Sequence, residues 1–229
     1  MSVSSSPLSR RDREKLYKRS EILLSAQEVF AEKGYAQATL EEIASRAEFG
    51  KGTLYNYFPG GKQEILLAIF EVLYDQLCEL ITSTFSGNED EPFRDLLFRF
   101  FEQMFSFFLL KLDLFVILIR EAHRMGGGDD PAPQAFFSKQ RNRTIAALSV
   151  PIQRAIDRGE IEPVSASFLA HIIMVNVNGC QMTACNIWDN KDPKAPKSSR
   201  EMAEFLTQLI CSGISQSAPL SQATPLSQD

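Results

Sequence analysis

Apolar residues recur every three or four positions along almost the whole chain, which is the spacing of amphipathic helices. No Asn-Gly or Asp-Gly pair stands between two alternating runs, so the pattern contains no hairpin signal. It predicts an all-α protein of eight or nine helices. The expected helices cover residues 13–33, a short helix opening at residue 39, 51–58, a helix starting at residue 62, 92–110, 112–125, 131–158, 165–189 and 198–215.

The first helices carry clear signals at their ends. The apolar stripe of the first one consists of Ile22, Ala26, Val29 and Phe30. Gly34 follows where a C-terminal cap is expected. Thr39 and Glu42 have the spacing of a capping box, in which each side chain satisfies an unpaired backbone N–H of the other. Ser198 and Glu201 repeat this spacing and predict the start of the last helix.

The second and third helices have the proportions of a helix-turn-helix. Each is about eight residues long and a tight turn, Glu48-Phe49-Gly50, separates them. The second helix of such a pair lies in the major groove of DNA, while the first crosses the backbone. Two short amphipathic helices also occur in helical proteins that bind no DNA, so the spacing alone leaves both interpretations open.

The residues in and around this pair favour DNA binding. They comprise ILLSAQEVFAEKGYAQAT from residue 22, TLEEIA from residue 39, Ala47, and KGTLYNYFP from residue 51. Over residues 15–75 the chain closely resembles the head of the tetracycline-repressor (TetR) family. The resemblance implies an N-terminal three-helix helix-turn-helix head, joined by a connecting helix to a larger helical domain for ligand binding and dimerisation.

We therefore expect a DNA-binding domain over residues 10–60 and a ligand-binding and dimerisation domain over 61–215. Residues 1–9 are Ser-rich, and residues 216–229 are polar with two prolines. Both ends are predicted to be disordered tails.

The resemblance assigns most DNA contacts to the third helix. Lys51 and Thr53 are expected to reach base edges, and Gly52 to let the backbone approach the DNA closely. Asn56 is expected to read a base, since its amide pairs bidentately with adenine. Tyr57 is expected to donate to a phosphate.

Three further residues complete this set with less defined roles. Tyr55 either packs in the core with its hydroxyl at the rim or contacts DNA. Thr39 and Lys62 are expected to hold phosphates at two helix N-termini, where the helix dipole favours an anion.

Two features depart from the family pattern. Many relatives have a glycine in the turn where this chain has Glu48, which places a carboxylate near the DNA-facing turn; we expect it to point to solvent. The link Pro59-Gly60-Gly61 before Lys62 is one residue longer than the usual one. This insertion puts the phosphate contact of Lys62 in question.

Charge is distributed unevenly along the chain. Residues 1–62 carry 10 basic and 8 acidic side chains, whereas the remainder carries 14 basic and 21 acidic ones, within a net charge of −5. The first helix begins with a basic arm that includes Arg10, Arg11 and Arg13. The arm is either a solvated helix start or follows DNA through phosphates or the minor groove, and its position beside the helix-turn-helix favours the second interpretation.

The acidic remainder is rich in phenylalanine, and in the resembled family this part encloses a ligand. Each phenylalanine either fills ordinary core or lines an apolar pocket. Polar residues at positions that look buried are candidate anchors. The expected ligand-binding residues are Phe101, Phe105, Phe108, Phe115, His123, Phe137, Asn176 and Gln181.

The last two helices are expected to form the seam of a homodimer. A symmetric dimer presents two recognition helices to an inverted repeat. The apolar faces of the helices predict an interface formed by Phe168, Ile172, Val175, Gly179, Phe205 and Leu209.

Several other classes of function are not expected. The chain has no nucleophile motif, no HExxH and no phosphate-binding loop, which argues against an enzyme. Neither His123 nor His171 has metal-ligand spacing to other ligands, so no metal or other cofactor is expected. Charges interrupt the most apolar stretch, 98–119, so it predicts no membrane span. Four scattered cysteines indicate reduced thiols and a cytoplasmic location.

The sequence thus predicts a ligand-responsive transcriptional regulator, a repressor that binds a double-stranded DNA operator as a homodimer and is released by a small hydrophobic or aromatic effector. A corepressor-dependent regulator or an activator would show the same features. A helical small-molecule carrier without specific DNA binding is the remaining alternative, and the basic arm and the KGTLYNYF segment argue against it.

Overall fold

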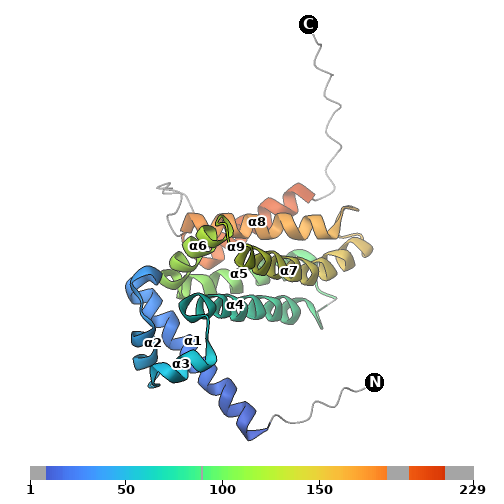
Figure 1. Ribbon diagram of the computed structural model, residues 1–229. Coiled ribbons are helices and arrows are strands. Elements are labelled where there is room, and N and C mark those ends of the chain that lie inside the picture. The colour runs from blue at the N-terminus through green and yellow to red at the C-terminus, as the bar shows by residue number, and fades with distance from the viewer. Residues whose placement is uncertain (1–8, 89, 185–195, 215–229) are drawn as a thin grey trace. The chain divides into compact units, whose positions relative to one another are not determined.

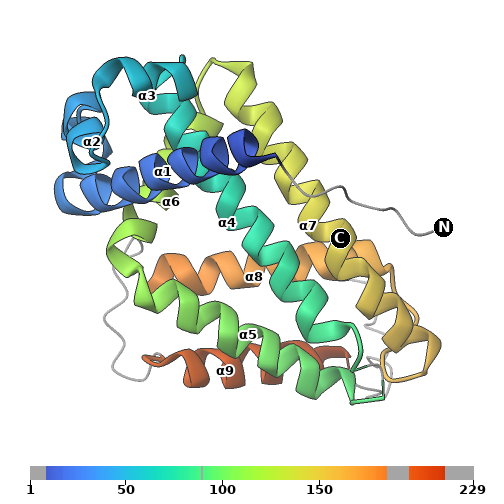
Figure 2. The ribbon, with the colours of Figure 1, turned by 90° about the horizontal axis from the view of Figure 1, so that it is seen from below.

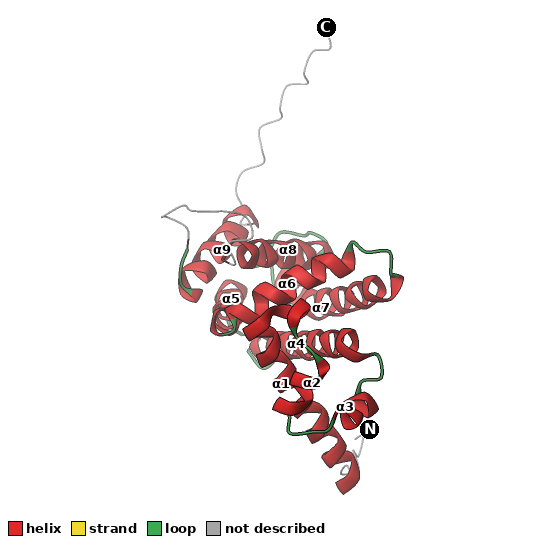
Figure 3. Ribbon diagram, turned by 60° about the vertical axis from the view of Figure 1, so that its left-hand side comes forward, coloured by secondary structure: helices red, strands yellow, loops and turns green. Residues whose placement is uncertain are grey.

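The computed structural model describes residues 9–88, 90–184 and 196–214. Regular structure in these ranges is entirely α-helical (Figure 3). None of the helices described there has the length and apolar character that a membrane crossing requires. The helices are α1 (Arg10–Gln37), α2 (Leu40–Arg46), α3 (Lys51–Tyr57), α4 (Gly61–Phe85), α5 (Phe93–Leu110), α6 (Leu112–Gly126), α7 (Pro131–Asp157), α8 (Ala166–Ala184) and α9 (Ser199–Ile214).

The predicted all-α class is confirmed, and each described helix has a counterpart in the sequence pattern. The first helix begins earlier than predicted because the Ser9 hydroxyl caps it, accepting a hydrogen bond from the Asp12 N–H at 3.1 Å. Gly34, with φ of 77°, interrupts this helix as predicted, but one more turn follows. The predicted tail 216–229, most of the tail 1–9, and residues 185–189 of the eighth predicted helix lie outside the described residues.

The described chain divides into two units. The first comprises the chain up to Glu79 together with Phe108–Asn142, and the second comprises Leu80–Phe107 together with the chain from Arg143 onward. The first unit therefore contains the predicted helix-turn-helix along with most of α4, all of α6 and the first part of α7. The proposed boundary between residues 60 and 61 stays a prediction.

The first unit is organised around one apolar core. The predicted stripe of α1 is fully or almost fully buried, with Ile22, Ala26 and Phe30 at 0% exposure. α2 and α3 have seven residues each, too few to be stable as isolated helices. α2 packs against α1, and α3 packs against α2 (Figure 1). Tertiary packing, rather than helix propensity, holds this pair in place.

The second unit brings α5, α8 and α9 together (Figure 2). The rings of Phe100, Phe101 and Phe105 are fully buried in it. The Arg94 guanidinium on α5 donates to the Gln208 side-chain oxygen on α9 at 3.0 Å. The capping box predicted at the start of α9 is present, since the Ser198 hydroxyl accepts from the Glu201 N–H and the Glu201 carboxylate accepts from the Ser198 N–H.

Glu48 occupies a strained backbone position in the turn between α2 and α3. Its φ is 58°, in the left-handed region, and no other described residue besides glycine has a positive φ. Its side chain is exposed, as expected. Only glycine adopts this region without a steric penalty, which accounts for the glycine of the family pattern at this position.

Replacing Glu48 by glycine is therefore expected to stabilise the first unit. Relief of the left-handed strain, less the greater entropy of an unfolded glycine, should raise the free energy of unfolding by about 0.5–1 kcal/mol. Thermal and urea unfolding measure this gain. Glu48→Ala removes the same carboxylate but keeps the strain, so it should show no such gain; equal stabilisation by both variants would mean that the charge, not the backbone, is responsible.

Candidate nucleic-acid interface

Two buried side chains fix the orientation of α3. Leu54 is 0% exposed and Phe58, at its C-terminal cap, is 1% exposed, and both belong to the core of the first unit. Tyr57 is half-buried and packs against the same core. Because these residues hold one side of α3 inward, the other side is presented outward.

The outward side of α3 carries most of the residues predicted to touch DNA. Lys51, Gly52, Tyr55 and Asn56 are exposed, and Thr53 is half-buried. Tyr55 is 42% exposed, so the interpretation that it packs in the core is wrong. We call these four exposed residues the α3 face.

Gly52 has no packing reason to be a glycine. A Cβ built at this position meets no neighbouring atom within 4 Å, and its φ is not in the left-handed region. Glycine inside a helix costs roughly 0.5–1 kcal/mol relative to alanine, so the fold of this chain is weakened without a compensating contact. A partner whose surface comes close to the helix backbone would supply the reason.

Lys51 is held by an ion pair with Glu41, in the first turn of α2. The hydrogen bond from the ammonium lowers the pKa of Glu41, and the carboxylate raises the pKa of Lys51 in turn. Both side chains are exposed, so an anion that approaches α3 can compete for the ammonium. Sequence reasoning missed this pair, since residues ten positions apart on two different helices carry no periodic signal.

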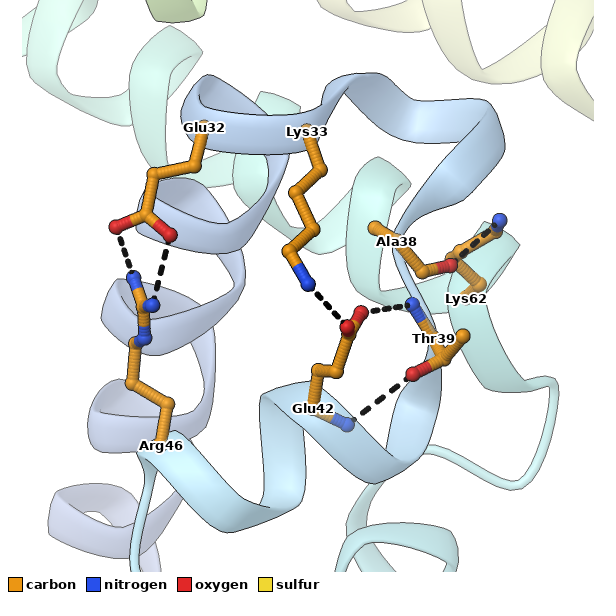
Figure 4. A network of polar contacts seen from close by, with 7 residues as sticks. All are labelled: Glu32, Lys33, Ala38, Thr39, Glu42, Arg46 and Lys62. Atoms are coloured by element: carbon orange, nitrogen blue, oxygen red, sulfur yellow. Dashed lines mark hydrogen bonds and ion pairs between the residues drawn. The ribbon is translucent and has the colours of Figure 1, made fainter.

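α2 is tied to α1 by a network of polar contacts (Figure 4). The Thr39 hydroxyl accepts from the Glu42 N–H at 3.2 Å, and the Glu42 carboxylate accepts from the Thr39 N–H at 3.1 Å, which is the predicted capping box. Lys33 also pairs with this carboxylate. Arg46 makes a two-point contact with Glu32 at 2.5 and 2.7 Å. Hydrogen bonds from Lys33 and Arg46 lower the pKa of their partner carboxylates, so both pairs favour the charged forms.

Lys62 lies differently from the prediction. Its ammonium donates to the backbone carbonyls of Tyr35, Ala36 and Ala38 at 2.7, 3.2 and 2.9 Å. These carbonyls belong to the end of α1 and the segment after it. Thr39, by contrast, is exposed at the start of α2, where the prediction placed a phosphate.

The basic arm lies in the first turns of α1. Arg10, Arg11 and Arg13 are exposed and form no ion pair with another described residue. Lys18 and Arg19, further along, are half-buried and pair with Glu14 and Glu71. The arm thus begins with three cations open to solvent.

The predicted ligand residues of the first unit include three phenylalanines with aromatic neighbours. The ring centroids of Phe108 and Phe115 lie 5.0 Å apart, and those of Phe137 and Phe70 also lie 5.0 Å apart. His123 is exposed, and its Nδ1 is bonded to the Ile119 carbonyl of its own helix. The expectation that His123 is buried is wrong, because the side of α6 that faces the core is the one with Leu114, Leu118 and Met125.

The other predicted ligand residues belong to the second unit. Phe101 and Phe105 are buried with their rings 6.3 Å apart. Asn176 donates to the Ile172 carbonyl one turn earlier on α8, and Gln181 is half-buried. A small cavity of about 10 Å³ in this unit is lined by other residues, including Phe85, Phe93 and Arg158.

The predicted dimer residues lie on α8 and α9, which contact each other in the second unit. They include five large apolar side chains that are strongly exposed in the single chain: Phe168 (64%), Ile172 (36%), Val175 (52%), Phe205 (53%) and Leu209 (52%). Gly179 on the same helix leaves open space where a Cβ would be. Exposed apolar surface of this kind on adjacent helices is typical of an association site.

A short helix pair with an outward recognition face, followed by an all-helical body, defines the class of helix-turn-helix DNA-binding regulators. The family model of bacterial regulatory proteins of the tetR family matches residues 22–69. The chain thus carries the DNA-binding head of the tetR family, and the proteins it resembles are transcriptional regulators.

Similar proteins agree with this assignment. The regulator CymR of Pseudomonas putida is 28% identical over 62% of this chain and 70% of its own length. The transcriptional activator FasR of Mycolicibacterium smegmatis is 40% identical, but over 26% of this chain and only 27% of its own length. The likeness to FasR is therefore confined to about a quarter of each chain.

Solved structures share the fold over nearly the whole chain. Salmonella enterica GusR matches with a TM-score of 0.66 and 20% identity, covering 91% of this chain and 99% of its own. The fatty acid degradation regulator FadR from Bacillus halodurans matches with a TM-score of 0.68 and 17% identity, covering 85% and 98%. At these identities the likeness shows the fold alone.

Proposed function

We propose that this regulator is a repressor that binds an inverted-repeat operator as a homodimer and is released by a small hydrophobic or aromatic effector. The observation that carries the DNA-binding part is the α3 face. It combines a lysine, an amide and a tyrosine hydroxyl with a glycine that the fold does not require. Such a face suits the major groove, where an amide pairs with adenine and a cation meets guanine or phosphate.

The roles of the remaining DNA-binding residues follow from their positions. Thr39 is proposed to donate its exposed hydroxyl to a phosphate at the start of α2, since that hydroxyl serves the capping box only as an acceptor. Arg10, Arg11 and Arg13 are proposed to follow the DNA backbone or minor groove, since they are open to solvent. Thr53 and Tyr57, both half-buried, are proposed to contribute from the edge of the α3 face.

Homodimerisation through α8 and α9 is supported by their exposed apolar side chains. The exposed apolar side chains of α8, Phe168, Ile172 and Val175, recur at intervals of four and three residues, which is the repeat of a helix that packs along a partner helix. Burying them against a second copy removes from water the apolar surface that the single chain exposes.

The effector is proposed to be apolar because the candidate residues in both units are mostly phenylalanines. Regulators of fatty acid metabolism occur among the similar proteins, for example in Bacillus subtilis, which makes acyl compounds sensible first ligands to test. We propose that the effector acts by shifting α4, which starts next to the helix-turn-helix. A cytoplasmic location is proposed because a DNA-binding regulator acts in the compartment that contains the DNA.

Activation is the second candidate mode of regulation. The relative FasR is named a transcriptional activator, and its alignment covers the same head region. Activator and repressor share the DNA-binding face, so the predictions below hold for both.

Lys51→Ala and Asn56→Ala are each expected to weaken operator binding by roughly 1–3 kcal/mol if they touch bases. Asn56→Ala should also relax the preference for one base pair, because the amide no longer reads it. Gel shift or fluorescence anisotropy on an inverted repeat from the protein's own promoter measures both effects. Gln153→Ala, an exposed residue of α7, serves as the control. Wild-type affinity of both α3 variants, with circular dichroism unchanged, would contradict the assigned face.

Gly52→Ala is expected to change stability and DNA binding in opposite directions. Alanine should raise the free energy of unfolding by about 0.5–1 kcal/mol, since its methyl group meets no neighbour and the helix gains propensity. The same methyl group should weaken operator binding, because it keeps DNA from the helix backbone. A variant that is more stable and binds the operator as tightly as the wild type would show that no close approach occurs at Gly52.

Phe168→Glu and Phe205→Glu are expected to give folded monomers, since both side chains are exposed in the single chain and a carboxylate cannot be buried unpaired in a dimer seam. Light scattering after size exclusion measures the mass. Leu110→Glu is the matched control, because Leu110 is 84% exposed but lies outside α8 and α9. If the Phe variants remain dimers while the control behaves identically, the seam lies elsewhere.

A further inference from the structure

Lys62 follows a link that is one glycine longer than usual, and its side chain points in a direction that the sequence did not predict. All three N–H bonds of the ammonium are used, because it donates to three backbone carbonyls between 2.7 and 3.2 Å away. The side chain is partly buried, and a lysine ammonium has three donors and no more. It has no donor left for a phosphate in this arrangement.

The N-terminus of α4 is also already occupied. The Glu64 carboxylate accepts a hydrogen bond from the Gly60 N–H at 2.7 Å and so places its own negative charge at this helix start. A Cβ on Gly60 would lie 3.1 Å from the same carboxylate oxygen, and Gly61 has φ of 65°. The left-handed backbone of Gly61 favours glycine in this turn, and a side chain at Gly60 would crowd the Glu64 carboxylate. The turn carries the chain into α4 with a carboxylate where a phosphate was expected.

The Tyr35 ring brings α6 into contact with the region around the Lys62 ammonium. The Lys62 ammonium lies 4.6 Å from the centroid of the Tyr35 ring, and the Arg124 guanidinium on α6 lies 5.9 Å from it. Cations at such distances are attracted to the ring. Arg124 is itself held by Glu121 at 2.7 Å. The end of α1, the start of α4 and the end of α6 thus meet at Tyr35.

We propose that Lys62 is a positioning residue that fixes the helix-turn-helix on α4 through the end of α1, and that it is not a phosphate ligand. The proposal rests on the proposed DNA-binding function and replaces the phosphate role expected for this lysine. The three carbonyls lie directly before Thr39, which opens α2. Holding them therefore sets the direction in which α2, and with it α3, leaves α1.

If Lys62 sets the direction of the helix-turn-helix, its loss should change how strictly the protein selects the spacing of the two operator half-sites. Without the ammonium the segment before α2 is free to vary, so the head loses its fixed direction and binding has to restrict it again. Lys62→Met should weaken operator binding by about tenfold, as expected for the loss of charge-assisted hydrogen bonds. It should also reduce the preference for the natural half-site spacing over an operator with one base pair inserted between the half-sites.

The salt dependence separates this role from phosphate binding. Loss of a phosphate contact lowers the slope of log affinity against log salt by about one, whereas loss of a positioning contact leaves it unchanged. We expect an unchanged slope for Lys62→Met. Lys62→Arg should resemble Lys62→Met, because a planar guanidinium does not fit three converging carbonyls. Lys51→Met is the control that should lower the slope without changing the spacing preference.

A slope lowered by about one in Lys62→Met, together with wild-type binding by Lys62→Arg, would overturn the proposal and restore the phosphate role. If Lys62→Met does not fold, Arg124→Gln provides the second test, since its exposed side chain leaves the core intact. It should reduce the spacing preference in the same direction and to a smaller extent; an unchanged preference would count against the proposal.

A measurement without DNA keeps this test separate from that of DNA binding. The Ala38 N–H donates to the Gly34 carbonyl at 3.2 Å, within the segment that Lys62 holds. Its hydrogen exchange should be faster in Lys62→Met than in the wild type. If the wild-type protein binds no operator but the exchange is accelerated in Lys62→Met, the proposed function fails and the contact of Lys62 with the end of α1 stands. Unchanged exchange would show that Lys62 does not restrain this segment and would overturn the positioning role.

Discussion

The packing of two very short helices is the constraint on which the rest of this structure depends. α2 and α3 have seven residues each and lose their shape without neighbours. Ile43 and Leu54, both fully buried, attach them to a core that also includes α1, the start of α4 and parts of α6. Because one side of α3 is taken by this core, the side left outside is determined, and it is the side that carries Lys51, Gly52 and Asn56.

Several charged side chains of the first unit make contacts within the protein. Lys33 and Arg46 are paired with carboxylates of the head, Lys51 pairs with Glu41, and Lys62 is directed at backbone carbonyls. These contacts hold α1, α2, α3 and α4 in fixed directions. Arg10, Arg11 and Arg13 remain open to solvent, which is consistent with the proposed DNA binding by a chain whose net charge is −5.

The sequence predicted the parts of this structure that depend on local signals. Helical periodicity gave the all-α class, and the capping boxes at Thr39 and Ser198 were recognisable from residue types and spacing. The exposed position of His123 was not, because a single helix does not reveal which of its sides a neighbour covers. The inward direction of Lys62 was missed for a related reason: it depends on carbonyls more than twenty residues earlier, which have no side-chain signature. The insertion before Lys62 was the one visible sign of it.

Selection from a pool of random DNA duplexes, using the full chain as bait and sequencing the bound fraction, tests most directly whether a symmetric dimer of this protein recognises specific DNA. We expect enrichment of an inverted repeat whose half-sites lie about one helical turn, or a multiple of it, apart. Recovery of the pool without any enriched motif, at a salt concentration where the protein is folded, would contradict this expectation.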